Sequence, residues 1–132
     1  MAVQRVCQPG CDRQTVNLGA SANGEYLRYE VEGRPSALFD LVDENNNVLL
    51  TSTDPPTAAG TYVRQWPKAG EAPALGNHVH TLGMQFIPAV SYRYAVSHCA
   101  SDGTVIAVLK DCTYTREDQT QSMFENLTIN VF

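Results

Sequence analysis

Apolar and polar residues alternate with a period of two along most of the chain, which is the pattern of β-strands with one buried face. Residues 27–32 alternate apolar with charged side chains, and residues 124–132 alternate apolar side chains with Asn and Thr. The same reading predicts strands over residues 27–32, 37–42, 48–53, 60–66, 78–86, 91–98, 104–110 and 124–132.

Turn sequences separate these segments. The run DENNN at residues 43–47 predicts a hairpin, and so does Ala-Ser-Asp-Gly at residues 100–103, because Gly103 tolerates a positive φ. No segment has helical periodicity with caps, and residues 116–123 supply one short turn at most. We therefore expect an all-β chain, with residues 1–132 forming a single two-sheet β-sandwich domain of about eight strands, Ig-like or jelly-roll-like.

The immunoglobulin comparison extends to architecture only. Immunoglobulin domains place a core Trp shortly after the first bridging Cys. Here Trp66 lies far downstream of Cys11. The sequence therefore predicts a general sandwich without pointing to that family.

Composition and charge exclude two classes of partner. The net charge of −5 argues against nucleic acid, since binding to phosphates depends on clustered Lys and Arg. No apolar run approaches the roughly 20 residues that span a bilayer, so we expect a soluble chain without membrane insertion. With 17% charged residues and many Asn, Gln, Ser and Thr, the composition favours a secreted or periplasmic location slightly over a cytoplasmic one.

Four cysteines, Cys7, Cys11, Cys99 and Cys112, leave two alternatives open. The turn residues within CQPGC allow a local Cys7–Cys11 disulfide, and reduced thiols are the equal alternative. We expect Cys99 and Cys112 not to be bonded, because a hairpin at 100–103 separates them by roughly 26 Å.

The motif His78-Val79-His80 is a candidate metal ligand pair, since alternate residues of a strand project to the same side. It resembles the start of the cupin metal motif, but no Glu stands where a cupin ligand would follow. His78 and His80 have the same phase as Leu82, which is predicted to face the core. The two rings are therefore expected at the start of this strand, on its core-facing side. We therefore expect no bound metal and no cofactor, and keep a metal-dependent enzyme as an alternative.

A ligand site is predicted at the base of the loop 67–77, the longest stretch without strand character. Aromatic, cationic and imidazole groups bracket this loop: Tyr62, Arg64, Trp66, His78 and His80. They favour a non-catalytic binding or accessory module for carbohydrate or protein. A structural subunit that assembles through an edge strand is a further alternative.

Overall fold

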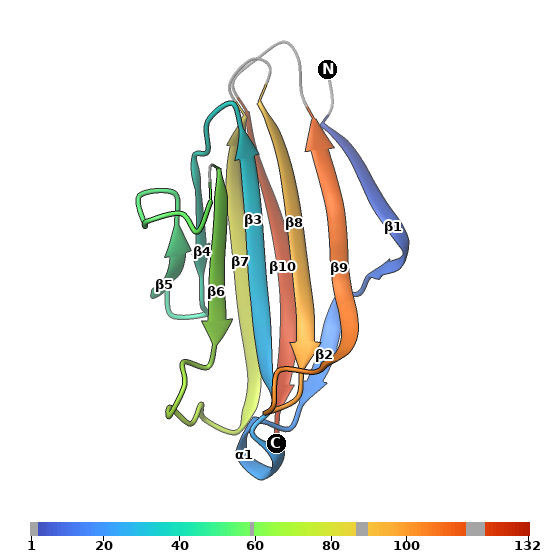
Figure 1. Ribbon diagram of the computed structural model, residues 1–132, viewed down its shortest axis with the longest axis vertical. Helices are drawn as coiled ribbons and strands as arrows, with labels where there is room; N and C mark the ends of the chain where they lie inside the picture. Colours follow the sequence, from blue (N-terminus) through green and yellow to red (C-terminus); the bar gives the residue numbers. More distant parts are fainter. Residues whose placement is uncertain (1–2, 59, 87–89, 116–120) are drawn as a thin grey trace.

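The computed structural model describes residues 3–58, 60–86, 90–115 and 121–132, and these form two five-stranded sheets packed face to face (Figure 1). The prediction of an all-β, two-sheet sandwich is confirmed. The described residues contain ten strands where the sequence predicts about eight. The elements are β1 (Gln4–Asp12), β2 (Thr15–Leu18), α1 (Ala20–Asn23), β3 (Tyr26–Arg34), β4 (Phe39–Val42), β5 (Val48–Thr51), β6 (Thr61–Trp66), β7 (Gly76–Phe86), β8 (Ser91–Cys99), β9 (Val105–Thr115) and β10 (Gln121–Val131).

The two additional strands, β1 and β2, lie in the segment that the sequence reading leaves unassigned. Pro9 and Gly10 look like a turn, but they belong to a bulge of β1, where the pairing with β9 jumps from Cys7–Cys112 to Asp12–Lys110. β1 is an edge strand, which tolerates a proline because one of its sides needs no hydrogen-bond partner.

The helical content of the described residues is small. The short helix α1 spans four residues, Ala20–Asn23. Within the described ranges no helix is long and apolar enough to cross a membrane. Most of the short turn predicted at residues 116–123 lies outside the described residues, and β10 begins at Gln121.

Sheet topology brings together strands that are distant in the sequence. The first sheet has the order β1-β9-β8-β3-β6 and the second the order β2-β10-β7-β4-β5. Among the described strands, only the pairs β4–β5 and β8–β9 join consecutive strands, and the β8–β9 turn is the one predicted at Ala100–Gly103. Strands β5 and β6 end the two sheets along the same edge of the sandwich (Figure 1).

The core fills the space between the sheets and follows the predicted alternation. The ring of Tyr29 stacks on that of Tyr94, with centroids 6.3 Å apart. The residues that fill this space are almost completely buried and include Leu27, Val31, Leu41, Leu82, Met84, Phe86, Tyr92, Val96, Tyr114, Leu127 and Ile129. Side chains of the opposite phase therefore form the two outer faces, where a ligand has access.

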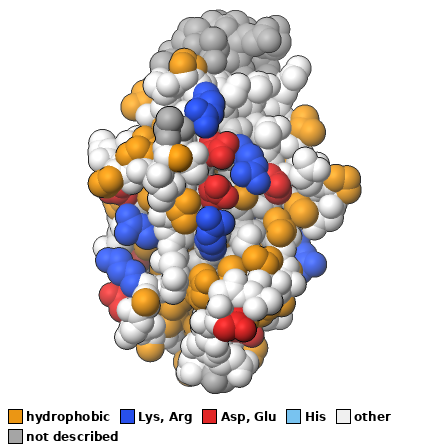
Figure 2. All heavy atoms as spheres, in the orientation of Figure 1, with side chains coloured by type: hydrophobic (Ala, Val, Ile, Leu, Met, Phe, Trp, Pro, Cys, Tyr) orange, Lys and Arg blue, Asp and Glu red, His pale blue; other side chains and the backbone are white. Residues whose placement is uncertain are grey.

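The outer face of the first sheet is covered by paired charges. Figure 2 shows basic and acidic side chains interleaved on this side of the molecule. Arg93 lies 3.0 Å from Asp111 and 3.8 Å from Glu30, and Arg28 lies 3.6 Å from Glu30. These charges therefore pair with one another on the outer face of the first sheet.

Candidate functional site

The three predicted ligand residues of β6 face the space between the sheets. Their partners on β3 are buried core residues, as in the pair Tyr62–Val31. Tyr62 packs edge-on against Phe39, with ring centroids 5.1 Å apart. The guanidinium of Arg64 lies 3.2 Å from a carboxylate oxygen of Asp54. These two side chains therefore make contacts that close the edge of the sandwich.

Trp66, His78 and His80 form one cluster of rings. The half-buried indole of Trp66 lies 5.3 Å from the ring of His78 and 4.4 Å from that of His80, centroid to centroid. The two nitrogens of His78 contact a carboxylate oxygen of Glu44 at 3.2 Å and the carbonyl oxygen of Ala74 at 2.7 Å. The structure thus joins three of the five predicted residues and places Tyr62 apart from them, against Phe39.

His80 is completely buried and its surroundings favour the neutral imidazole. The Tyr29 hydroxyl and Nδ1 of His80 share a hydrogen bond of 2.5 Å. Burial raises the pKa of Tyr29 far above its usual range, so the hydroxyl keeps its proton and is able to donate to the imidazole. The other nitrogen, Nε2, is buried with no partner among the described residues. Burial lowers the pKa of His80 to about 4. His78 and His80 are therefore held by separate partners.

The buried imidazole predicts a loss of stability in acid. His80 stays neutral in the folded state but is protonated in the unfolded chain below its ordinary pKa of 6.5. We therefore expect the contribution of His80 to the free energy of unfolding to be complete above pH 6.5. This contribution should fall by about 3 kcal/mol as the pH drops to about 4. Urea titrations across this range measure the slope. The slope should flatten in His80→Gln, whose amide oxygen can accept from Tyr29; equal slopes in both proteins would contradict the assignment.

An edge pocket of about 380 Å³ opens between β5 and β6, at the base of the loop 67–77. Arg64 and Trp66 line it together with Lys68 and Glu71 from that loop. The remaining lining residues are Asp43, Val48, Leu49 and Gln65. Arg64 is paired with Asp54, and the Trp66 ring is packed against two imidazoles. Both side chains therefore already have partners within the protein.

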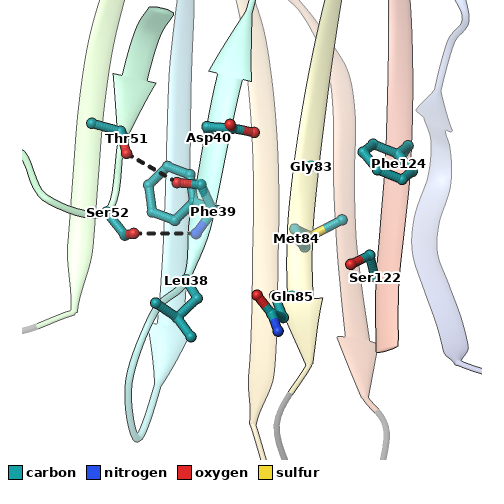
Figure 3. Close-up of a pocket in the computed structure, with 10 residues that line it drawn as sticks. All are labelled: Leu38, Phe39, Asp40, Thr51, Ser52, Gly83, Met84, Gln85, Ser122 and Phe124. Atoms are coloured by element: carbon teal, nitrogen blue, oxygen red, sulfur yellow. Dashed lines mark hydrogen bonds between the residues drawn. The ribbon is translucent and has the colours of Figure 1, made fainter. Parts of the chain in front are cut away.

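An outer pocket of about 390 Å³ lies on the exposed face of the second sheet (Figure 3). One row of residues in register, Thr51, Asp40, Gly83 and Phe124, crosses it from β5 to β10. The other residues that line the pocket are Leu38, Phe39, Ser52, Met84, Gln85 and Ser122. The sequence reading includes none of these ten residues in its predicted ligand site.

Gly83 creates the space for this pocket. A Cβ atom at this position would lie 3.0 Å from Oδ1 of Asp40 and 3.1 Å from Cε1 of Phe124. The absence of a side chain thus lets the carboxylate and the phenyl ring approach each other across β7. The Phe124 side chain remains 65% exposed beside the resulting hollow.

The polar groups of the outer pocket fall into two kinds. Thr51 Oγ1 donates to the carbonyl oxygen of Phe39, and Ser52 Oγ accepts from the Phe39 N–H, both over 3.2 Å (Figure 3). The backbone N–H of Gln85 donates to the carbonyl oxygen of Leu38 over 2.9 Å, but no hydrogen bond drawn in the same view reaches the side chain of Asp40 or of Gln85. The carboxylate and the amide are therefore available to a ligand.

A signal for Phe124 exists in the sequence. Leu127, Ile129 and Val131 mark the phase of β10 that faces the core. Phe124 stands in the opposite phase, together with Asn126, and so belongs to the solvent-facing side of the strand. An aromatic residue in a polar phase, opposite a glycine within a predicted strand, is the pattern that could have located this pocket.

The cysteines form a long-range disulfide. Cys7 is bonded to Cys112 across a sequence separation of 105 residues. The local Cys7–Cys11 alternative is wrong, because β1 pairs Cys7 directly with Cys112 and leaves Cys11 in the bulge. The prediction that Cys99 and Cys112 are not bonded is confirmed, and the Cys99 thiol is free and buried.

Potential metal ligands gather at one point among the described residues. Cys7, Asp12 and Cys112 place their ligand atoms within 4.8 Å of one another, but the two sulfur atoms are joined in the disulfide. The predicted pair of His78 and His80 does not belong to such a group among the residues that the structure describes.

Comparison of the chain with protein-family models, with curated proteins and with solved structures finds no match. By its fold, the described part of the chain belongs to the class of all-β proteins with two packed sheets, here of five strands each.

Proposed function

We propose that this chain is a non-catalytic carbohydrate-binding module and that its ligand occupies the outer pocket beside Phe124. The observation that carries the proposal is a phenyl ring, 65% exposed on the polar face of β10, at the border of a concave and otherwise polar hollow. Exposed aromatic rings of this kind are common anchors for ligands.

The chemistry of the pocket suits a sugar. A pyranose ring presents an apolar C–H face, which can cover an aromatic ring, and an equatorial rim of hydroxyl groups. Phe124 supplies the ring, while Asp40 and Gln85 supply a carboxylate and an amide that make no hydrogen bond to the other pocket residues of Figure 3. Such polar groups fix the orientation of a ligand, directly or through water.

The same pocket argues for binding rather than hydrolysis. Cleavage of a glycosidic bond ordinarily uses two carboxyl groups that flank the bond. Asp40 is the only acidic residue that lines the outer pocket within the described part of the chain. The edge pocket is the weaker candidate, since Trp66 is packed against His78 and His80.

Removal of the phenyl ring tests the proposal. We expect Phe124→Ala to weaken sugar binding at least about tenfold and to change the free energy of unfolding by less than about 1 kcal/mol, because the ring is mostly exposed. Affinity electrophoresis measures retardation in gels that contain β-1,4-glucan, β-1,3-glucan, mannan or galactan. Phe132→Ala, which removes a 52% exposed ring from the end of the chain, is the matched control.

Filling the hollow provides a second variant that keeps every binding group. Gly83→Ala adds one methyl group, which forces the ends of Asp40 and Phe124 to move by a few tenths of an ångström. We expect binding to fall in this variant while urea unfolding changes little. Absence of retardation in all four gels, or full retardation of Phe124→Ala, would overturn the proposed function.

A further inference from the structure

An adjoining pocket of about 530 Å³ continues the outer pocket along the same sheet face. The two pockets share Asp40 and Phe124. The adjoining pocket is also lined by Val42, Asp43, Glu44, Asn46, Val48, Val79 and Thr81. From Gln85 in the first pocket to Val79 in the second, β7 covers roughly 20 Å at about 3.3 Å per residue. The combined length exceeds that of one sugar ring.

We infer that the two pockets form one groove that holds an internal stretch of an uncharged glycan, with sugar units on both sides of Phe124. The inference rests on the proposed carbohydrate binding and adds the length and the charge of the ligand. Both pockets are open hollows on a sheet face and not enclosed cavities, so a chain can enter and leave the groove at its two ends.

The charge of the groove has one sign. Asp40, Asp43 and Glu44 line it, and no Lys or Arg is among the described residues that line either pocket. Asp43 accepts two backbone N–H bonds within its own turn, and Glu44 accepts the backbone N–H of Val79 over 3.0 Å. These bonds hold two of the carboxylates at fixed positions. A glycan that carries carboxylate or sulfate groups would be repelled by all three acids.

The length of the ligand is tested by calorimetry with oligomers of one to six units prepared from the polysaccharide that retards the protein most. We expect affinity to rise at least about tenfold between the monomer and the tetramer. In Val79→Arg, which fills the adjoining pocket, the tetramer should lose this gain while monomer binding remains. Equal affinity for monomer and tetramer, or an unchanged gain in Val79→Arg, would overturn the two-sided groove.

The charge of the ligand is tested with the same tetramer after oxidation of its primary alcohols to carboxylates. At low ionic strength we expect the oxidised form to bind at least about tenfold more weakly, and added salt should narrow the difference. Asp40→Asn, which removes one negative charge from the groove, should also narrow the difference in affinity between the neutral and the oxidised tetramer. Asp102→Asn removes the same charge in the β8–β9 turn and should have no effect.

The outcomes separate this inference from the proposed function. Suppose that the neutral and the oxidised tetramer bind with equal affinity at low salt, while Phe124→Ala still fails to bind either one. This result would overturn the selection against charged glycans, but the proposed carbohydrate binding would stand. Absence of binding by every neutral glycan would overturn both.

Discussion

Loss of the Cys7–Cys112 disulfide is expected to lower the free energy of unfolding by about 3–5 kcal/mol. The bond closes a loop with a sequence separation of 105 residues. A cross-link over a loop of this length restricts the unfolded chain strongly, and the chain-entropy model gives about 4.7 kcal/mol for 100 residues. It also joins the edge strand β1 to β9, so that reduction should loosen β1 before the rest of the first sheet.

The measurement is thermal and urea unfolding of the double variant Cys7→Ser/Cys112→Ser, whose midpoint should fall by roughly 10–20 °C. Cys11→Ser is the control, because Cys11 is a free thiol in the bulge of β1 and its loss should change little. If Cys11→Ser were as destabilising as the double variant, and peptide mapping recovered a bond between Cys7 and Cys11, the long-range assignment would be wrong.

The central strands could be predicted from the sequence because their alternation is strict. In β3 the phase of Leu27, Tyr29 and Val31 is the buried phase, as the pattern predicts. The β4–β5 and β8–β9 hairpins could be predicted as well, since each depends on a local turn: Asp43 accepts the N–H of Asn45, and the Ala100 N–H donates to the carbonyl of Thr104. Period and turn chemistry are local properties, so they are visible in one sequence.

The strands that were missed depend on distant partners. β1 contains Pro9 and Gly10 and lacks a clear alternation, and its residues are extended because β9 pairs with them. β2 is four residues long and is held by parallel pairing with β10, more than one hundred residues away. Local propensity does not carry this information, because long-range pairing determines the structure of such segments.

The outer pocket was missed for a related reason. It forms where β5, β4, β7 and β10 come into register, and only the sheet order brings Asp40, Gly83 and Phe124 into one row. The predicted site around Trp66 was inferred from residues that flank one loop in the sequence. The structure brings three of them, Trp66, His78 and His80, into contact. The core-facing phase of His78 and His80 is predicted from the strand pattern, whereas the complete burial of His80 and the packing of the Trp66 ring against both imidazoles depend on the pairing of distant strands.

A cluster of charges between the sheets was also not predicted. Glu125, in the core-facing phase of β10, accepts hydrogen bonds from Arg5 and, over 3.0 Å, from the hydroxyl of Tyr114. The Lys110 ammonium is completely buried, 3.3 Å from Asp12 and 3.7 Å from Glu125. Bulges in the β8–β9 ladder shift the phase of β9, which turns Lys110 inward although the pattern of the strand does not indicate it. This cluster joins β1 and β9 of the first sheet to β10 of the second.

Glu125→Gln is therefore expected to cost about 3–5 kcal/mol of unfolding free energy. The substitution preserves shape but removes a charge, and it leaves the buried ammonium of Lys110 with Asp12 as its one remaining acidic partner among the described residues. Urea unfolding at neutral pH measures the loss. Glu30→Gln, on the outer face of the first sheet, removes the same charge from an exposed network and should cost less than about 1 kcal/mol.

A double-mutant cycle distinguishes the loss of a charge pair from a general disturbance of packing. Lys110→Met replaces the buried ammonium with an apolar chain of similar length. If the cost of Glu125→Gln comes from an uncompensated ammonium, then adding Lys110→Met should recover about 2 kcal/mol or more, because no buried cation is then left without its carboxylate. Additive losses in the double variant would show that Glu125 and Lys110 act independently. In that case the stabilising contacts of Glu125 would be its hydrogen bonds from Arg5 and Tyr114, and the sheets would be joined there without help from Lys110.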